Sequence, residues 1–287
     1  MIMKKLIFSL CCFLMIFACA CSEKKEQTEI TEDLTNETSN LENTEEIISE
    51  NSTVQYGWFV NAQNQIYRVG DNLKEAELVL ELSDISDISG QIDTFFINEE
   101  CAFLSYFSDL EEIVVMYTGD SGRIWNKTFV PYKEYGGPNE TFLSFVDENI
   151  GYLLYCSDPA AGKMNKILFI SKDGGKTFQE QAELSTVIRN QPEDMLFFTE
   201  TCGFMTTINY GEEAYLYQTE DAGITWNPIA LEVPKKEEFS YINGVALEKV
   251  ENSNQQAKLT LKGVGGEEEC YFEFVTKDMG ETWELVK

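Results

Sequence analysis

The chemistry open to this chain is that of carboxylates. Its 287 residues include 50 aspartates and glutamates but no histidine, which excludes serine or cysteine triads and histidine-based metal sites. Two carboxylates suffice for glycoside hydrolysis, and oxygen ligands suffice for calcium. Asp84, Asp87 and Asp93 come nearest to an oxygen-ligand cluster but lack the glycine and terminal glutamate of a calcium loop. We therefore expect a solvated loop there and no cofactor, with calcium left as an open alternative that no motif indicates. The sequence singles out no catalytic pair.

One group of aspartates recurs in a fixed context. Asp120, Asp173, Asp221 and Asp278 each follow a Ser or Thr by two residues, and each precedes a Gly by two and an aromatic residue by five. Their spacings of 53, 48 and 57 residues match the length of a four-stranded blade and indicate a repeat architecture. In a turn, the Gly can adopt positive φ and the Asp can accept hydrogen bonds from the turn's own amides. Each aspartate is most simply a turn clamp.

Strand-like runs surround each motif. Runs such as 112–117 and 270–275 precede the motifs, a short run carrying the aromatic residue follows, and two more apolar runs lie upstream. Four strands with the motif in the last turn form one antiparallel sheet, and radial repetition of such sheets makes a β-propeller. Residues 56–60, 65–69 and 77–82 form a degenerate first unit whose innermost strand is in question. We predict an all-β propeller of five blades, with four or six as open alternatives.

The four motifs resemble the Asp-box, or BNR, repeat of sialidase-like propellers. Other propellers with this repeat include ten-bladed receptor domains of the sortilin type, xyloglucan hydrolases and photosystem II assembly factors. The resemblance covers residues 53–287 and implies the fold but no single activity, because this fold hosts enzymes and pure binding modules. The motif residues are Asp120, Gly122, Trp125, Asp173, Gly175, Phe178, Asp221, Gly223, Trp226, Asp278, Gly280 and Trp283.

Sialidase chemistry, as this resemblance implies it, needs three converging arginines, a tyrosine paired with a glutamate, and an acid-base aspartate. The chain holds only Arg68, Arg123 and Arg189, and it has no Phe-Arg-Ile-Pro segment. Arg123 lies inside a motif turn, and Arg68 lies on a third strand. Lysine cannot replace a bidentate arginine clamp without loss of geometry. We therefore expect a protein that is not a sialidase and lean towards a protein that is not an enzyme.

The N-terminus has the pattern of a secretory signal. Lys4 and Lys5 precede an apolar run over residues 6–17, which is too short to span a membrane and ends in small residues. The ending resembles the lipobox of bacterial lipoproteins, which implies removal of residues 1–20 and acylation of Cys21, with Cys19 as the alternative. Stable anchoring takes two or more acyl chains. We expect a lipoprotein, palmitate-labelled and held on the extracytoplasmic face of the cell membrane.

Residues 21–52 are rich in Glu, Thr, Asn and Ser and contain no aromatic residue, which predicts a lipidated, disordered acidic tether before the propeller at 53–287. The chain carries a net charge of −29, so nucleic acid is excluded as a partner and cationic partners are favoured. Cys101, Cys156, Cys202 and Cys270 have no zinc-site spacing, and we expect apolar fillers or free thiols.

Binding residues are expected on the loops that join one blade to the next and on the loops between second and third strands. The first set comprises residues 83–92, 131–139, 184–194 and 233–239, and the second comprises 107–111, 157–165 and 209–213. These loops carry side chains of the types that anchor interfaces: Tyr132, Tyr135, Lys163, Arg189 and Tyr210. The expected function is a non-catalytic binding or assembly module for an unknown protein or glycan. The alternative is a glycan-binding or glycoside-hydrolase-like protein that uses the channel mouth.

Overall fold

The computed structural model describes residues 41–43, 54–61, 65–69, 75–85, 87–132, 137–159, 164–209, 215–250, 253, 255–266 and 270–286. These residues form strands β1 to β20 and two short 3₁₀ helices, η1 (Leu82–Asp84) and η2 (Lys236–Glu238). No α-helix occurs in these ranges, and no helix there has the length and hydropathy to cross a membrane. The all-β prediction is confirmed.

Four consecutive groups of four antiparallel strands form blades 2 to 5. Blade 2 comprises β5 (Ile88–Phe96), β6 (Ala102–Ser108), β7 (Ile113–Thr118) and β8 (Asn126–Val130). Blade 3 comprises β9 (Pro138–Phe145), β10 (Gly151–Ser157), β11 (Lys166–Ser171) and β12 (Gln179–Glu183). Blade 4 comprises β13 (Pro192–Phe197), β14 (Gly203–Asn209), β15 (Leu216–Thr219) and β16 (Asn227–Pro228). Blade 5 comprises β17 (Tyr241–Lys249), β18 (Ala257–Val264), β19 (Cys270–Thr276) and β20 (Glu284–Leu285).

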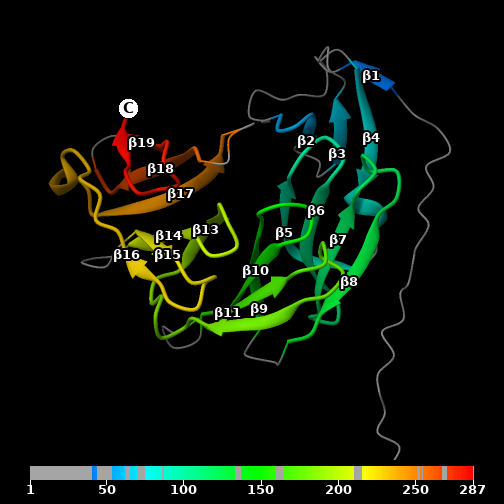
Figure 1. The fold of residues 1–287 in the computed structure, drawn as a ribbon, viewed down its shortest axis with the longest axis horizontal. Coiled ribbons are helices and arrows are strands. Elements are labelled where there is room, and N and C mark those ends of the chain that lie inside the picture. The colour runs from blue at the N-terminus through cyan, green and yellow to red at the C-terminus, as the bar shows by residue number, and fades with distance from the viewer. Residues whose placement is uncertain are drawn as a thin grey trace, which may run out of the picture.

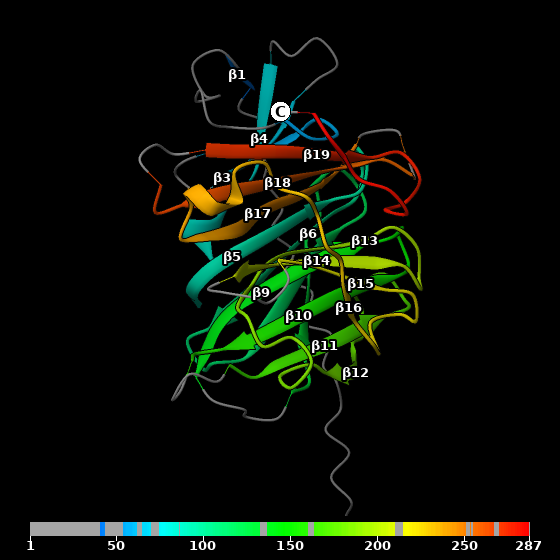
Figure 2. The same cartoon turned by 90° about the vertical axis from the view of Figure 1, so that its left-hand side faces the viewer.

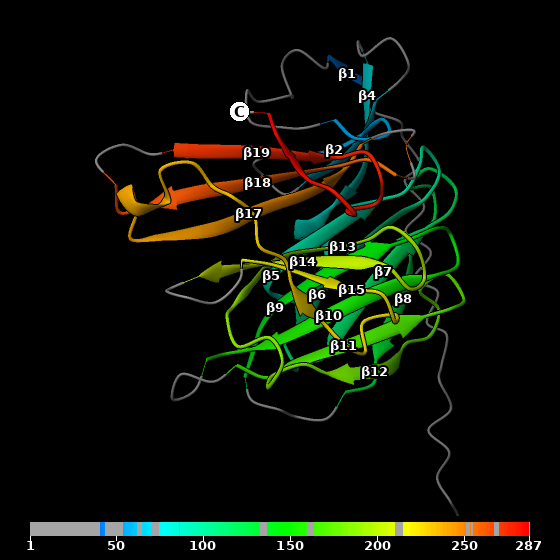
Figure 3. The same cartoon turned by 60° about the vertical axis from the view of Figure 1, so that its left-hand side comes forward.

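The first strand of each of these blades is the inner strand. The inner strands β5, β9, β13 and β17 contact one another in sequence around the centre. Figure 1 shows the blades in an arc, with blade 1 at one end and blade 5 at the other. The end of β14 also pairs with the start of β17, which joins blades 4 and 5 into one sheet. Figures 2 and 3 show blade 5 packed against blade 4 in this way. The predicted β-propeller class is confirmed.

Blade 1 is irregular, as predicted. It contains β2 (Trp58–Val60), β3 (Gln65–Val69) and β4 (Glu75–Glu81), with β1 (Leu41–Asn43) paired to the outer side of β4. The Trp58 ring stacks on Phe96 of blade 2, just as Phe103 stacks on Phe145 and Tyr152 on Phe197 at the next two seams. Because Phe103 and Tyr152 lie on second strands, β2 is also a second strand. Among the described residues, blade 1 therefore has no inner strand.

Two boundaries differ from the sequence prediction. Residues 41–43 fall within the predicted tether but form β1, because their backbone pairs with the open edge of β4. The connections between blades are also shorter than predicted, since β5 begins at Ile88, β9 at Pro138 and β13 at Pro192. Each of these strands begins with Pro or has polar residues or Gly near its start, which reads as loop in a sequence. Inner strands tolerate such residues because one edge faces the central channel.

The four motif turns have the same hydrogen bonds. In each turn the Ser or Thr hydroxyl donates to Asp Oδ1 at 2.8–3.0 Å and accepts from the Gly amide. The amide four residues after each Asp also donates to Oδ1, as Thr225 does to Asp221 at 2.8 Å. Thr177, Thr225 and Thr282 add a hydroxyl bond to Oδ2, whereas blade 2 has Ile124 at that position. The turn therefore closes through its own side chains.

These turns are anchored to the turn between the first and second strands of the same blade. The amides of Ser121, Gly174, Ala222 and Met279 donate to the carbonyls of Glu100, Asn149, Thr201 and Gln255. Because neighbouring strands are antiparallel, both turns lie on one side of the ring. This side also holds the carboxyl ends of the inner strands.

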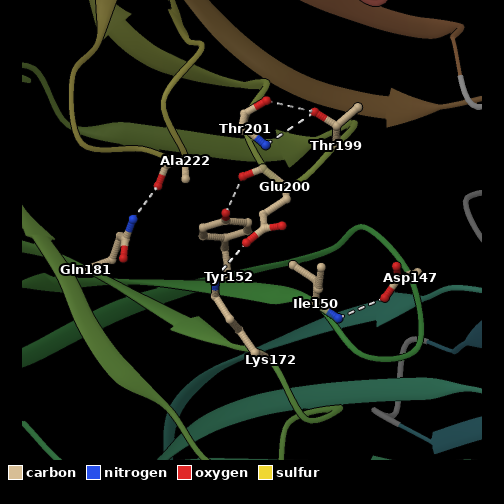
Figure 4. Close-up of polar contacts among 9 residues, drawn as sticks. All are labelled: Asp147, Ile150, Tyr152, Lys172, Gln181, Thr199, Glu200, Thr201 and Ala222. Carbon is tan, nitrogen blue, oxygen red and sulfur yellow. Dashed lines mark hydrogen bonds and ion pairs between the residues drawn. The ribbon is translucent and has the colours of Figure 1, made fainter.

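Neighbouring blades are joined by aromatic stacking and by polar contacts. Figure 4 shows the seam between blades 3 and 4, where the Tyr152 hydroxyl donates to the Glu200 carbonyl at 2.5 Å and Lys172 pairs with the Glu200 carboxylate at 2.6 Å. Gln181 donates to the Ala222 carbonyl in the motif turn of blade 4. Tyr152 is fully buried, and burial raises the pKa of its hydroxyl. These contacts fix the order in which the inner strands surround the centre.

Candidate functional site

A cavity of about 350 Å³ lies between the inner strands. Its walls come from the carboxyl halves of β5, β9, β13 and β17 and from the segment before β2. The lining residues are 54–56, 93–97, 143, 145, 146, 194–196 and 247–249. A volume of this size is typical of small-molecule sites, and its walls combine apolar side chains with a few polar groups.

Two aspartates, Asp93 on β5 and Asp194 on β13, contribute carboxyl groups to this cavity. Asp93 Oδ2 accepts from the Leu143 amide of blade 3 at 2.5 Å, and Asp194 Oδ2 accepts from the Leu247 amide of blade 5 at 2.6 Å. Ser144 Oγ links blades 3 and 4 in the same way, because it accepts a hydrogen bond from the Phe197 amide at 2.7 Å. Inner strands of neighbouring blades diverge, so these side chains satisfy amides that the ladders leave unpaired.

Both carboxyl groups are held in their neutral form over an unusual pH range. Burial raises the pKa of Asp93 to about 8; the Leu143 amide lowers it, and the nearby Asp194 carboxylate raises it. Burial likewise raises the pKa of Asp194 to about 7, against the amides of Leu247 and Met195 and with a further rise from Glu248. The charged neighbours that act on the two groups are thus other carboxylates. A carboxyl pKa close to neutrality, in a cavity, is a feature of functional sites.

The acidic character extends along the inner strands. Burial raises the pKa of Glu193 on β13 to about 7, with contributions from Glu140 and Asp194. Burial also raises the pKa of Glu140 on β9, against a hydrogen bond with Gln191. Lys249 lines the cavity on β17, and burial lowers the pKa of its ammonium while Asp147 raises it. The channel wall therefore carries more acidic than basic groups.

Aromatic and aliphatic side chains complete the walls. Phe95 and Phe145 lie near each other with ring centroids 6.4 Å apart, and Tyr56, Leu143 and Met195 also face the cavity lining. Apolar walls keep the dielectric low, which is why the carboxyl groups resist ionisation. The site can therefore donate hydrogen bonds as neutral acids or compensate a positive charge as carboxylates.

A larger groove of about 870 Å³ lies between the outer parts of blades 4 and 5. It is lined by the connection at 229–234 and by the last hairpin at 280–283 with Leu285. Its carboxylates, Glu232 and Glu281, are both exposed. Of these two sites in the described part of the chain, the central cavity is the stronger candidate because carboxyl groups enclosed between blades line it and four blades converge on it.

Of the residues predicted for the binding face, Tyr132 and Arg189 are described. The Tyr132 hydroxyl donates to the Glu111 carbonyl, and its ring lies 5.1 Å from that of Tyr155. Tyr132 thus packs against the interior of blade 3, whereas Arg189 is exposed. Tyr135, Lys163 and Tyr210 lie outside the described residues. Neither Tyr132 nor Arg189 lines the cavity, so the predicted face and the cavity are different regions.

The three arginines do not line the cavity either. Arg68 donates to the Tyr56 carbonyl at 2.7 Å and lies over the Trp58 ring, while Arg123 and Arg189 are exposed. The three aspartates considered as a calcium cluster also separate. Asp84 is exposed in η1, Asp87 pairs with Lys127 at 2.8 Å, and Asp93 reaches the cavity. In the described ranges, no group of three or more Cys, Asp or Glu side chains could hold a metal ion.

The four cysteines of the propeller are free. Cys101 and Cys156 are buried, and burial raises the pKa of the Cys101 thiol to about 11. Cys202 and Cys270 are partly buried. All four are free and at least partly buried, which agrees with the prediction of free thiols or apolar fillers.

Sequence reasoning missed Asp194 and gave Asp93 the wrong setting. A signal was present: each aspartate stands three residues before the inner-strand phenylalanine, Phe96 or Phe197, at the point where the strand becomes apolar. An acidic residue at the same place in two repeats marks a position that faces a shared environment. The feature that makes these carboxyl groups unusual, their burial between blades, is visible only in the fold.

The sheets define a β-propeller of four-stranded antiparallel blades. Solved structures with a similar fold include the GH74 xyloglucanase from Xanthomonas campestris, with a TM-score of 0.49 and 14% identity over 81% of this chain and 36% of that chain. The Hadza microbial sialidase Hz136 has a TM-score of 0.46 and 13% identity, over 79% of this chain and 55% of that chain. YCF48 from Cyanidioschyzon merolae has a TM-score of 0.38 and 11% identity, over 78% of this chain and 80% of that chain.

This chain spans about a third of the xyloglucanase chain, so the likeness covers only part of that protein. No protein-family model and no curated protein matches the chain. At these identities the similarity concerns the fold alone, and function has to be argued from the site.

Proposed function

We propose that this chain is an extracytoplasmic, membrane-anchored lipoprotein whose propeller is a non-catalytic binding module, with the central cavity as its ligand site. The observation that supports the proposal best is the convergence of Asp93 and Asp194 on one cavity enclosed by four blades. Both carboxyl groups also accept backbone amides of the next blade, so they hold the cavity in shape. Preorganised walls are what a binding site needs.

The anchoring part of the proposal rests on the N-terminal sequence. Cys21, with Cys19 as the alternative, would carry the acyl chains. Replacement of both cysteines by serine should abolish palmitate labelling and release the protein from the membrane. Continued labelling or membrane attachment of the double variant would contradict lipidation at this site.

A carbohydrate-active enzyme is the second candidate, and one specific observation favours it. A general acid needs a carboxyl group that keeps its proton near neutral pH, and the raised pKa values of Asp93 and Asp194 meet that condition. Each group is nevertheless tied to a backbone amide of the neighbouring blade, a task that is structural. These structural hydrogen bonds favour a binding role over a catalytic one.

One experiment separates the two candidates. A glycan array with a hydrolysis readout is applied to the protein from residue 22 onwards, which keeps β1 in place, together with the Asp93→Asn and Asp194→Asn variants. Product release by the wild type that both variants abolish would support the enzyme. Binding of a ligand without turnover, weakened by both variants, would support the binding module. Binding that neither variant alters would move the site away from the cavity.

A further inference from the structure

We propose that the central cavity selects a small organic dication, a diamine or polyamine, which places an ammonium group beside each of Asp93 and Asp194. This inference rests on the proposed function, because it names the class of ligand for the same cavity. It follows from the position of the two carboxyl groups, the hydrogen-bonding capacity that they retain, and the charges around them.

The two carboxyl groups enter the cavity from different walls. Asp93 comes from blade 2 and Asp194 from blade 4, so the two groups enter the cavity from walls separated by blade 3. Both groups line the same cavity, and the Asp194 carboxylate raises the pKa of Asp93. A ligand with one positive group satisfies one wall, whereas a flexible ligand with two satisfies both. Diamines are the simplest ligands of that kind.

Each carboxyl group keeps hydrogen-bond acceptor positions that the protein does not use. A carboxylate offers about four acceptor positions. Asp194 uses one on each oxygen, for the amides of Met195 and Leu247, and Asp93 uses one for the Leu143 amide and another for the Thr94 amide. Acceptor positions remain on each group for an ammonium donor. Calcium would need six to eight oxygen ligands, which two partly occupied carboxyl groups do not supply.

The charged groups around the cavity are mostly acidic. The charged groups on the surrounding elements are Glu140 on β9, Glu193 on β13, and Glu248 and Lys249 on β17. Three of these four are acidic, and Lys249 interacts with the Asp147 carboxylate. A cationic ligand would compensate carboxylates that now face other carboxylates. The net charge of −29 also raises the local concentration of cations.

Aromatic walls add to this selectivity. Tyr56, Phe95 and Phe145 line the same cavity, and ammonium groups or their adjacent methylenes pack well on aromatic faces. The apolar lining suits the hydrocarbon spacer of a diamine. The charged side chains of the lining are mostly acidic, so an anionic ligand would be repelled.

Binding should release protons and strengthen with pH. A cation favours the ionised carboxyl groups, so complex formation at pH 7 must expel protons from Asp93 and Asp194. The affinity should therefore rise up to about tenfold per pH unit between pH 6 and pH 8, for each proton released. Surface binding to ordinary carboxylates, which are already ionised at pH 6, shows no such rise.

The test uses isothermal titration calorimetry on the full chain in detergent at 0.15 M salt, with putrescine and spermidine as probes and a neutral xylo-oligosaccharide for comparison. Measurements at pH 6 and pH 8, in buffers of different ionisation heat, count the released protons. We expect diamine binding that tightens at least tenfold at pH 8. Asp93→Asn and Asp194→Asn should each weaken it at least tenfold, and Asp84→Asn, an exposed control in η1, should not.

Three results would overturn the inference. Diamine binding with the same affinity in all variants would assign it to the acidic surface. Binding of the neutral oligosaccharide alone, lost in the Asp93 and Asp194 variants, would refute the dication while leaving the proposed binding site intact. No binding of any probe, with capture of a protein partner insensitive to both variants, would refute the dication and the cavity together. Circular dichroism of each variant checks that the fold is retained.

Discussion

The aspartates of three motif turns and those of the central cavity have the same side chain, but their surroundings shift its pKa in opposite directions. At the rim, the side chains within the turn stabilise the carboxylate: hydrogen bonds from Thr225 and Thr219 lower the pKa of Asp221, and bonds from Thr282 and Thr276 lower that of Asp278. At the centre, burial overrides the amide bonds and raises the pKa of Asp93 and Asp194. The rim aspartates accept more hydrogen bonds than the central ones, and the central ones are further removed from water, so both differences shift the pKa in the same direction.

This difference separates structural from functional carboxylates. A rim aspartate is satisfied by residues within four positions of itself, so it has little left to offer a ligand. A central aspartate holds partners 50 or more residues away and faces a cavity. The four repeated motifs, which dominate the sequence, thus maintain the blades. The less conspicuous pair at the centre has the properties of a site.

The largest effect is expected from a change in the rim turn itself. Gly280 has φ +84°, and a Cβ there would lie 2.0 Å from Cζ of Phe204 in the neighbouring second strand. Gly280→Ala should therefore destabilise the protein by about 3–5 kcal/mol, from the left-handed conformation and the overlap together. Urea unfolding measures the loss. Gly119→Ala, where nothing lies within 4 Å, is the control, and equal effects of the two changes would contradict the packing described.

At the centre, Asp93→Asn should change how stability depends on pH. The folded state keeps the Asp93 proton up to about pH 8, whereas the unfolded chain loses it near pH 4. Wild-type stability must therefore fall as pH rises between these values. The amide keeps an acceptor for Leu143 and has no proton to lose, so the variant should be more stable at pH 9 by roughly 2–5 kcal/mol.

Urea unfolding at pH 5 and pH 9 measures this change. The two proteins should differ much less at pH 5 than at pH 9, and Asp84→Asn should match the wild type at both. A variant that is destabilised equally at both values would show that Asp93 acts as an ordinary ionised acceptor.

The rim carboxylate should show the reverse dependence. The pKa of Asp221 is lowered, so its stabilising effect is present above pH 4 and is lost as pH falls below that value. Asp221→Ala removes bonds to the Thr225 amide and hydroxyl and to the Thr219 hydroxyl. After allowance for solvent screening we expect a loss of about 1 kcal/mol at pH 7. A thermal melt at pH 7 and pH 3 checks it, and a loss that persists undiminished at pH 3 would refute the sign.

The smallest effect concerns one hydroxyl of the rim. Thr225→Val removes the 2.6 Å bond to Asp221 Oδ2 and reproduces the apolar residue that blade 2 carries as Ile124. Because this bond is exposed, the cost should stay below about 1 kcal/mol. Differential scanning calorimetry against Ile124→Thr, which adds the hydroxyl to blade 2, provides a matched pair. The two substitutions should shift the melting temperature in opposite directions.

The same contrast explains what could be predicted from the sequence. The blades were predictable because a 48–57-residue repeat and local strand patterns carry them, and the irregular first blade was visible in its missing motif. The repeated position of Asp93 and Asp194 was visible in the sequence, but their burial was not, since the partner of Asp194, Leu247, lies 53 residues away in another blade. The predicted binding residues came from loop positions, and Tyr132 packs inward against Tyr155 instead of lining the cavity.

The most direct test of the account is an NMR titration of the aspartate carboxyl carbons, with Asp93 and Asp194 assigned from their asparagine variants. The Asp93 and Asp194 resonances should titrate near pH 8 and pH 7, while those of Asp173, Asp221 and Asp278 should titrate below the ordinary range of an aspartate. Titration of Asp93 and Asp194 near pH 4, together with the rim aspartates, would contradict the claim that the centre and the rim are different kinds of site.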